Sequence, residues 1–330
     1  MSNLERHPHE TTAGGLATVS PEPVRRLLEA REVPLGGTRA MVVRRTLPHR
    51  DLPTVGAWCF ADDYGPSDVR GSAGMQVPPH PHTGLQTVTW LLEGEVRHQD
   101  SVGSDQRVRP GQLSLMTAGR GITHAETSPA DHPPTLRGLQ LWVALPDRDR
   151  HVAPHFEHHA ELPLLSDGGL AATLIVGELA GQRSPATAYA PLVGADVSLA
   201  ADAVARLPLE PAFEHAVLAV SEGVVVEGEH VAKAAMVYLG CGRRDVALAG
   251  GPSGARLLLL GGAPLEEELL MWWNFVGRDH DEIVAFRTEW EAARTGASTR
   301  FGSVPRYDGA PLAAPELPTV RLKPRRRPPR

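Results

Sequence analysis

Two pairs of potential metal ligands, one at each end of the segment 78–126, constrain this chain more than any other feature. The first pair is His80 and His82, and the second is His124 and Glu126. In a β-strand, residues i and i+2 project from the same face. Two strands of this kind, facing each other inside a barrel, would direct three imidazoles and one carboxylate toward a single point. We therefore predict a metal site built from these side chains.

The first pair is embedded in the run Pro-Pro-His-Pro-His, where each proline fixes a backbone φ angle and so restricts the directions of the ligands. A His-x-His pair by itself is a weak signal, because the chain has 15 histidines and repeats the pattern at His7 and His9. That second pair has no strand pattern and no partner ligands around it, so we expect it to be exposed to solvent. The alternative for His80 and His82 is a pair of barrel-mouth histidines that only form hydrogen bonds.

The predicted ligand set also restricts the metal. Three neutral imidazoles and one carboxylate suit iron(II), and also nickel, cobalt, copper, manganese or zinc. Four protein ligands leave positions open on a six-coordinate ion for water, a substrate or dioxygen, which suits catalysis better than a closed structural zinc site does. Glu126 is the only charged ligand, so it could either bind the metal or take a proton from a substrate.

The other histidines in and between the predicted strands are expected to be exposed rather than ligating. Two of them are adjacent in sequence, so in a strand they would face opposite ways. Cys59 lies in an apolar run and is expected to be a small core residue. The histidines in question are His98, His132, His151, His155, His158 and His159.

The composition favours strands. Glycine and proline are abundant, with 33 and 30 residues, whereas aromatic residues make up 5% of the chain. This composition suits short strands joined by tight turns better than long helices. Apolar and β-branched runs recur with turn residues between them, which predicts an all-β barrel or sandwich. The clearest of these runs are 40–47, 55–60, 85–92, 113–116, 139–145 and 172–177.

A weak internal repeat predicts two similar β-barrels in tandem, because the run 217–224 resembles the run 88–95. Counting back from the glycine in each run places Leu209 and Pro211 where the first barrel has its His-x-His pair. Neither side chain is a metal ligand, so we expect the second barrel to be metal-free.

These patterns divide the chain into an arm, two barrel domains and a tail. A capping-box-like start at Asp279 and apolar residues at helical spacing predict a helix near 279–295, and a short helix is also considered at 23–31. The proline- and arginine-rich end is expected to be a solvated tail, with a nucleic-acid or targeting segment as the alternative. The predicted segments are 1–37 (flexible arm), 38–147 (metal-binding barrel), 148–300 (metal-free barrel with the helix) and 301–330 (tail).

Charge and cysteine content exclude several other classes of protein. The formal net charge is −6 and the predicted domains hold no basic cluster, so nothing supports direct nucleic-acid binding by the folded part. Cys59 and Cys241 stand far apart and match no disulfide framework or zinc-finger spacing. The chain begins without a signal-peptide pattern and has no apolar run of membrane-spanning length. We therefore expect a cytoplasmic protein with no membrane association.

Taken together, these motifs resemble those of the pirin family of two-domain cupins. The likeness extends over residues 38–305 and is most specific between the two ligand pairs. The motifs that carry it are His80-Pro81-His82-Thr83-Gly84, Thr87-Val88-Thr89-Trp90, Glu93-Gly94, His98, Asp100-Ser101, Gly103, Pro110-Gly111, Met116–Glu126, Trp272–Val276 and Arg300-Phe301-Gly302.

The resemblance implies two tandem cupin barrels, each a double-stranded β-helix, packed face to face and followed by a short C-terminal helix. It also implies iron(II) in the first barrel, held by His80, His82, His124 and Glu126. The general cupin pattern has a glutamate where this chain has Gln86. Because Glu126 supplies the carboxylate, metal binding is expected to survive this difference.

The resemblance leaves more than one function open. In the first, the protein is a quercetin 2,3-dioxygenase-like oxidoreductase that uses dioxygen on an aromatic or enol substrate, and Glu126 helps to deprotonate that substrate. In the second, nothing turns over, and the oxidation state of the iron controls binding to a protein partner, as in animal family members that act as nuclear co-regulators. A structural bicupin with adventitious metal is a third alternative. The oligomeric state is left open.

Overall fold

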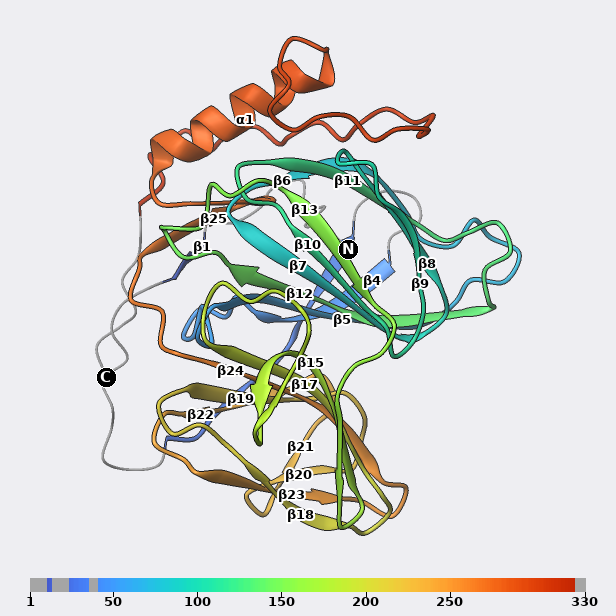
Figure 1. The fold of residues 1–330 in the computed structure, drawn as a ribbon, viewed down its shortest axis with the longest axis vertical. Coiled ribbons are helices and arrows are strands. Elements are labelled where there is room, and N and C mark those ends of the chain that lie inside the picture. The colour runs from blue at the N-terminus through green and yellow to red at the C-terminus, as the bar shows by residue number, and fades with distance from the viewer. Residues whose placement is uncertain (1–10, 14–23, 36–40, 324–330) are drawn as a thin grey trace.

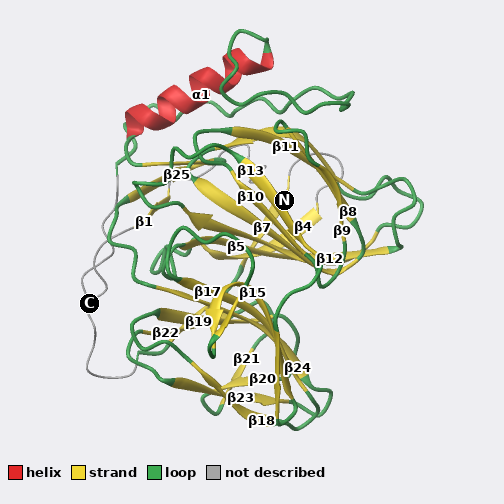
Figure 2. Ribbon diagram, viewed as in Figure 1, coloured by secondary structure: helices red, strands yellow, loops and turns green. Residues whose placement is uncertain are grey.

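The computed structural model describes residues 11–13, 24–35 and 41–323 of the chain. Two β-barrels are stacked on each other, and a helix with the segment that follows it crosses the far side of the first barrel (Figure 1). Strands and loops make up nearly all of the rest (Figure 2). The prediction of an all-β protein with two barrels and a C-terminal helix is confirmed.

The first barrel pairs a seven-stranded sheet with a four-stranded sheet. Residues of the central strands alternate between the barrel interior and the second barrel, so both faces of the larger sheet are buried. In order of neighbours, the larger sheet contains β13 (His155–His159), β10 (Leu113–Thr117), β7 (Leu85–Glu93), β12 (Thr135–Ala144), β5 (Trp58–Asp68), β4 (Met41–Leu47) and β3 (Arg31–Leu35), and the smaller sheet contains β6 (Gln76–His82), β11 (Ile122–Thr127), β8 (Val96–Asp100) and β9 (Asp105–Val108).

The second barrel repeats this plan with an eight-stranded and a four-stranded sheet. The order β22-β19-β24-β17-β15 matches the order β10-β7-β12-β5-β4 of the first barrel, which agrees with the repeat seen in the sequence. The larger sheet contains β14 (Leu164–Asp167), β15 (Leu170–Leu179), β17 (Leu192–Leu199), β24 (Ala255–Gly262), β19 (Glu214–Ala219), β22 (Met236–Gly240) and β2 (Arg26–Leu28), with β16 (Gln182–Arg183) beside β15, and the smaller sheet contains β18 (Val204–Pro208), β23 (Asp245–Gly250), β20 (Val224–Val226) and β21 (Glu229–Val231).

A small third sheet and the helix complete the fold. The sheet consists of β1 (Thr11–Ala13), β25 (Leu269–Trp272) and β26 (Phe275–Gly277), and the helix α1 spans His280–Arg294. Asp279 is the N-cap, and its side chain accepts a hydrogen bond from the backbone of Glu282 at 2.9 Å. No helix among the described residues is long and apolar enough to cross a membrane.

The two barrels meet through their larger sheets, in an apolar cluster that includes Trp58 and Trp90. The indole Nε1 of Trp58 donates to the carbonyl oxygens of Val193 and Gly261, each at 3.1 Å. The indole Nε1 of Trp90 donates to Asp196 Oδ2 at 2.9 Å. The junction is therefore a packed core with satisfied polar groups, which fixes one barrel relative to the other.

Parts of the predicted flexible arm are strands. The helix considered near 23–31 is wrong, because β2 pairs with β22 of the second barrel and β3 pairs with β4 of the first. Leu28 and Val33 are buried, and this burial anchors the two short strands. The partner of β2 lies far away in the sequence, so local residue pattern carried little information about that strand, whereas β3 pairs with the next strand along the chain.

The predicted domain limit and the predicted tail also differ from the structure. β13 pairs with β10, so residues 155–159 belong to the first barrel rather than to the second domain. Most described residues after 300 are exposed, but Phe301 and Leu322 are each 1% exposed, so the segment is anchored to the fold. The backbone N–H of Leu312 donates to the carbonyl of Pro79 at 2.8 Å, so the segment also contacts β6.

Candidate metal centre

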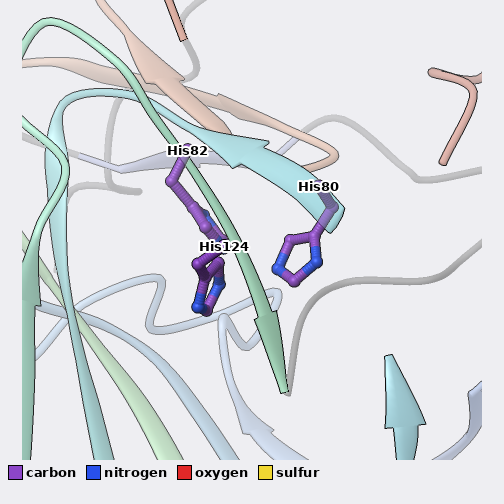
Figure 3. A group of neighbouring side chains, drawn as sticks. All are labelled: His80, His82 and His124. Carbon is purple, nitrogen blue, oxygen red and sulfur yellow. The ribbon is translucent and has the colours of Figure 1, made fainter. Parts of the chain in front are cut away.

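Strands β6 and β11 bring the predicted histidines together. The two strands are antiparallel, and His80 lies directly opposite His124 in their register. Ligand nitrogens of His80, His82 and His124 all lie within 4.8 Å of one another, on side chains that converge as Figure 3 shows. The ring centroids are 4.3 Å apart for His80 and His124, and 5.0 Å apart for His82 and His124. A cluster of this kind could hold a metal ion.

Glu126 is buried but lies outside this group of mutually close ligand atoms. The register of β6 and β11 shifts between His124 and Glu126, where Glu126 is opposite Val77. This irregularity falls at two consecutive prolines, Pro78 and Pro79, which cannot donate to the strand ladder. The hydroxyl of Thr89, on β7, donates to Glu126 Oε1 at 3.1 Å and orients the carboxylate.

Burial keeps the three imidazoles neutral. All three are at most 1% exposed. Burial lowers the pKa of His80 to about 4, and it lowers the pKa of His82 and His124 well below the usual value, with the neighbouring imidazoles acting in the same direction. Nε2 of His124 and the ring nitrogens of His82 have no hydrogen-bond partner in the described part of the chain. Buried nitrogens without partners are costly, so this donor set fits a metal ion.

The prediction that His98 is exposed is wrong, because His98 is 3% exposed and contacts His124. Nε2 of His98 donates to Asp100 Oδ2 at 3.0 Å, and Nδ1 of His98 lies 3.4 Å from Nδ1 of His124. Burial alone would raise the pKa of Asp100, but hydrogen bonds from His98 and Ser104 outweigh it and lower that pKa. Asp100 is therefore an ionised acceptor.

These hydrogen bonds indicate which ring nitrogens of His98 and His124 carry a hydrogen. Because the carboxylate of Asp100 accepts, Nε2 of His98 carries a hydrogen, and Nδ1 of His98 is free to accept from His124. Nδ1 of His124 must then carry a hydrogen and donate a hydrogen bond to Nδ1 of His98. That tautomer leaves the Nε2 lone pair of His124 available for a metal.

We expect replacement of His98 by phenylalanine to weaken metal binding by about 10–100-fold, the usual range for losing a group that orients a ligand. The new ring can still stack on Phe156, whose centroid is 4.3 Å from that of His98, so packing is largely retained. Competition with a chelator would measure the affinity. His155→Phe, on the partly exposed β13, is the matched control, and equal affinities for both variants would contradict the role of His98.

Aromatic side chains separate the cluster from solvent. The ring of Trp142 meets the ring of His82 edge to face, with centroids 5.2 Å apart. The ring of Phe60 stacks on the ring of Trp142, with centroids 4.0 Å apart and nearly parallel planes. Cys59, next to Phe60, is fully buried, as predicted for a core residue. The imidazole cluster therefore lies against an apolar wall that limits access of water.

The remaining predicted positions lie elsewhere. Gln86 is on the face of β7 turned toward the second barrel, where its amide donates to Thr117 Oγ1 at 2.9 Å and to the carbonyl of Thr187 at 3.1 Å. His7 and His9 lie outside the described residues. The other expected non-ligands, which are outside the cluster of three imidazoles, are His132, His151, His155, His158 and His159.

Sequence reasoning missed Thr89, His98 and Asp100. The signal for the last two was available, because His98 and Asp100 are two residues apart on one predicted strand and so share a face. Thr89 gave no such signal, since only the pairing of distant strands brings its hydroxyl to Glu126.

Comparison with known proteins gives consistent matches for both barrels. Residues 39–143 match the family model described as Pirin, and residues 194–296 match the model described as Pirin C-terminal cupin domain. A Pseudomonas aeruginosa protein named "Putative quercetin 2,3-dioxygenase" is 44% identical over 289 residues, which cover 88% of this chain and 89% of that protein. A pirin-like protein of Caulobacter vibrioides is 37% identical, covering 81% of this chain and 93% of that protein.

Solved structures agree with these matches. A crystal structure titled as quercetin 2,3-dioxygenase from Acinetobacter baumannii superposes with a TM-score of 0.84 at 40% sequence identity. The superposition covers 90% of this chain and 96% of that one.

Proposed function

Because the chain belongs to the pirin family, we propose that it is a metal-dependent dioxygenase acting on quercetin-like flavonols or related enols. The observation that carries the proposal is the buried cluster of three neutral imidazoles, in which ring nitrogens of His82 and His124 have no hydrogen-bond partner in the described part of the chain. The names of relatives that are 44% and 40% identical support the reaction and the class of substrate.

In this proposal His80, His82 and His124 hold one divalent metal ion, with Glu126 as the fourth protein ligand. Iron(II) is the first choice, and nickel, cobalt, copper, manganese and zinc suit the same nitrogen and oxygen donors. When bound, the ion would polarise a substrate hydroxyl and make reaction with dioxygen accessible. The mixed set of neutral imidazoles and one anion favours such an ion over magnesium or calcium.

The chain's own residues would prepare the substrate. Glu126 would accept the proton of an enol or catechol hydroxyl, leaving the substrate as its anion. Thr89 would hold Oε1 of that carboxylate in place during the transfer, through the hydrogen bond it already makes. Trp142 would exclude water and present an apolar face to an aromatic substrate.

Oxygen uptake by iron-loaded protein in the presence of quercetin tests the proposal. Glu126→Gln is expected to reduce the rate by about 10²–10⁴-fold, the usual contribution of a positioned general base. Metal content must be measured in the same samples, because loss of metal would give the same result by another route. No uptake by fully loaded protein with any flavonol or enol would overturn the enzymatic proposal and favour a metal-dependent regulator that binds a protein partner.

A further inference from the structure

A cavity of about 950 Å³ lies in the second barrel, away from the three histidines of the first. It is bounded by the end of β15, by the loop that leads to β17, and by the segment between β18 and β19. Its volume is at the upper end of the range found for pockets that hold small molecules. The lining side chains used below are Glu178, Arg183, Tyr189, Glu210, Phe213 and His215.

His215 is a buried polar residue in the lining of this cavity. It lies on β19, and its face of the strand also carries Val217 and Ala219, which belong to the apolar interior of the second barrel. The opposite face carries Ala216 and Leu218, which pack toward the first barrel. The imidazole of His215 therefore points into the second barrel rather than toward the junction.

One ring nitrogen of this imidazole is unsatisfied in the described structure. His215 is 1% exposed, and its Nδ1 has no hydrogen-bond partner in the part of the chain that is described. Burial lowers the pKa of His215 to about 4, so the ring is neutral at physiological pH. The room for the ring comes from Gly261, where a Cβ would lie 2.6 Å from Cδ2 of His215. A buried, unpaired polar nitrogen on a residue that lines a cavity is a candidate partner for a ligand.

The walls of the cavity are held in place by hydrogen bonds to both barrels. The Thr187 carbonyl accepts from Gln86 at 3.1 Å, and the Thr187 N–H donates to Glu157 Oε2 at 3.1 Å. The hydroxyl of Ser184 donates to the carbonyl of Ile175 at 2.8 Å. The loop is therefore tied down before any ligand arrives, as in a preformed pocket.

Charge restricts the ligand. Arg183 forms an ion pair with Glu178, so its positive charge is already neutralised. Glu210 adds a negative charge to the lining, which disfavours an anionic ligand. The rings of Phe213 and Tyr189 favour a planar aromatic molecule. A hydroxyl can either donate to Nδ1 of a neutral histidine or accept from it, so it pairs with both tautomers.

We propose that the second barrel is a binding site for an uncharged planar molecule with a hydroxyl group, a phenol, that hydrogen-bonds to His215. This site is independent of the metal centre and of its proposed reaction. It gives the barrel without the His-x-His pair a role of its own.

Binding of 2-naphthol to the full-length protein, measured by calorimetry in the metal-loaded and the chelator-treated forms, tests the proposal. We expect binding in both forms, and also in His124→Ala, because the cavity does not include the metal ligands. Naphthalene, which lacks the hydroxyl, and 2-naphthoate, which is anionic, should each bind about tenfold more weakly, the equivalent of one lost hydrogen bond.

Two variants separate this site from other places where a phenol could bind. His215→Leu should reduce 2-naphthol affinity about tenfold and leave naphthalene affinity nearly unchanged. Ala188→Trp, at an exposed position of the lining, should block both ligands without disturbing the core. His230→Leu, at an exposed histidine of the same barrel, is the matched control. The proposal is overturned if 2-naphthol binding is lost in His124→Ala, or if it survives unchanged in both His215→Leu and Ala188→Trp.

Discussion

Alanine in place of His124 is expected to weaken metal binding by more than about a hundredfold, because loss of an orienting group alone costs about 10–100-fold. His124 is central to the cluster, since its ring is 4.3 Å from that of His80 and 5.0 Å from that of His82. Without it, two imidazoles and a carboxylate remain. Elemental analysis after dialysis against a weak chelator would measure the loss, and activity should fall in parallel.

His158→Ala is the control for this experiment. His158 lies on β13 of the same barrel, is partly buried, and is 3.4 Å from the hydroxyl of Ser114. It is not part of the cluster, so its replacement should leave metal content unchanged. If both variants keep stoichiometric metal with equal affinity, the imidazole cluster is not the metal site.

The sequence predicted that the three imidazoles lie together because that signal was local. The spacing of His80 and His82 fixed which face of β6 they share, and the spacing of the second pair did the same for β11. What spacing could not predict is how far Glu126 stands from the three imidazoles. The register of β6 against β11 shifts beside Pro78 and Pro79, so Glu126 is opposite Val77 rather than opposite one of these prolines.

Contacts between distant segments were the main limit on prediction. His98 was expected to be exposed because its spacing to Asp100 shows that the two share a face but not which distant segment covers that face. Its burial depends on Phe156, which comes from β13 after the chain has crossed the barrel. The strand β2 presents the same problem, since it belongs to the sheet of the second barrel although it precedes the first in sequence.

The segment after α1 shows a further long-range effect, because it covers the outside of both ligand strands. The carbonyl of Gly302 accepts from the hydroxyl of Thr123 at 3.3 Å, next to His124 on β11. Nε of Arg300 donates to the carbonyl of Arg120 at 2.7 Å, in the turn that leads into the same strand. On β6, the carbonyl of Pro79 accepts from the backbone of Leu312. The segment therefore packs on the outer side of β6 and β11, the two strands that carry the predicted ligands.

Phe301 is the apolar anchor of this segment. Its ring packs edge to face on Trp290 of α1, with centroids 5.6 Å apart, and lies 6.1 Å from the ring of Phe275. It also lies against Gly121, where an added Cβ would come within 3.2 Å of the Phe301 ring. Gly121 immediately precedes β11, so the ring of Phe301 links the helix to the start of a ligand strand.

Replacement of Phe301 by alanine is therefore expected to lower the free energy of unfolding by about 3–5 kcal/mol, the usual range for a buried phenylalanine. Metal affinity should fall as well, by about tenfold, because the start of β11 loses its support and His124 its fixed position. Chemical denaturation and chelator competition would measure the two effects. Val320→Ala, at a side chain that is 65% exposed in the same segment, should change stability by less than about 0.5 kcal/mol. If Phe301→Ala is destabilised but binds metal as tightly as the Val320→Ala protein, the segment stabilises the fold without supporting the metal site.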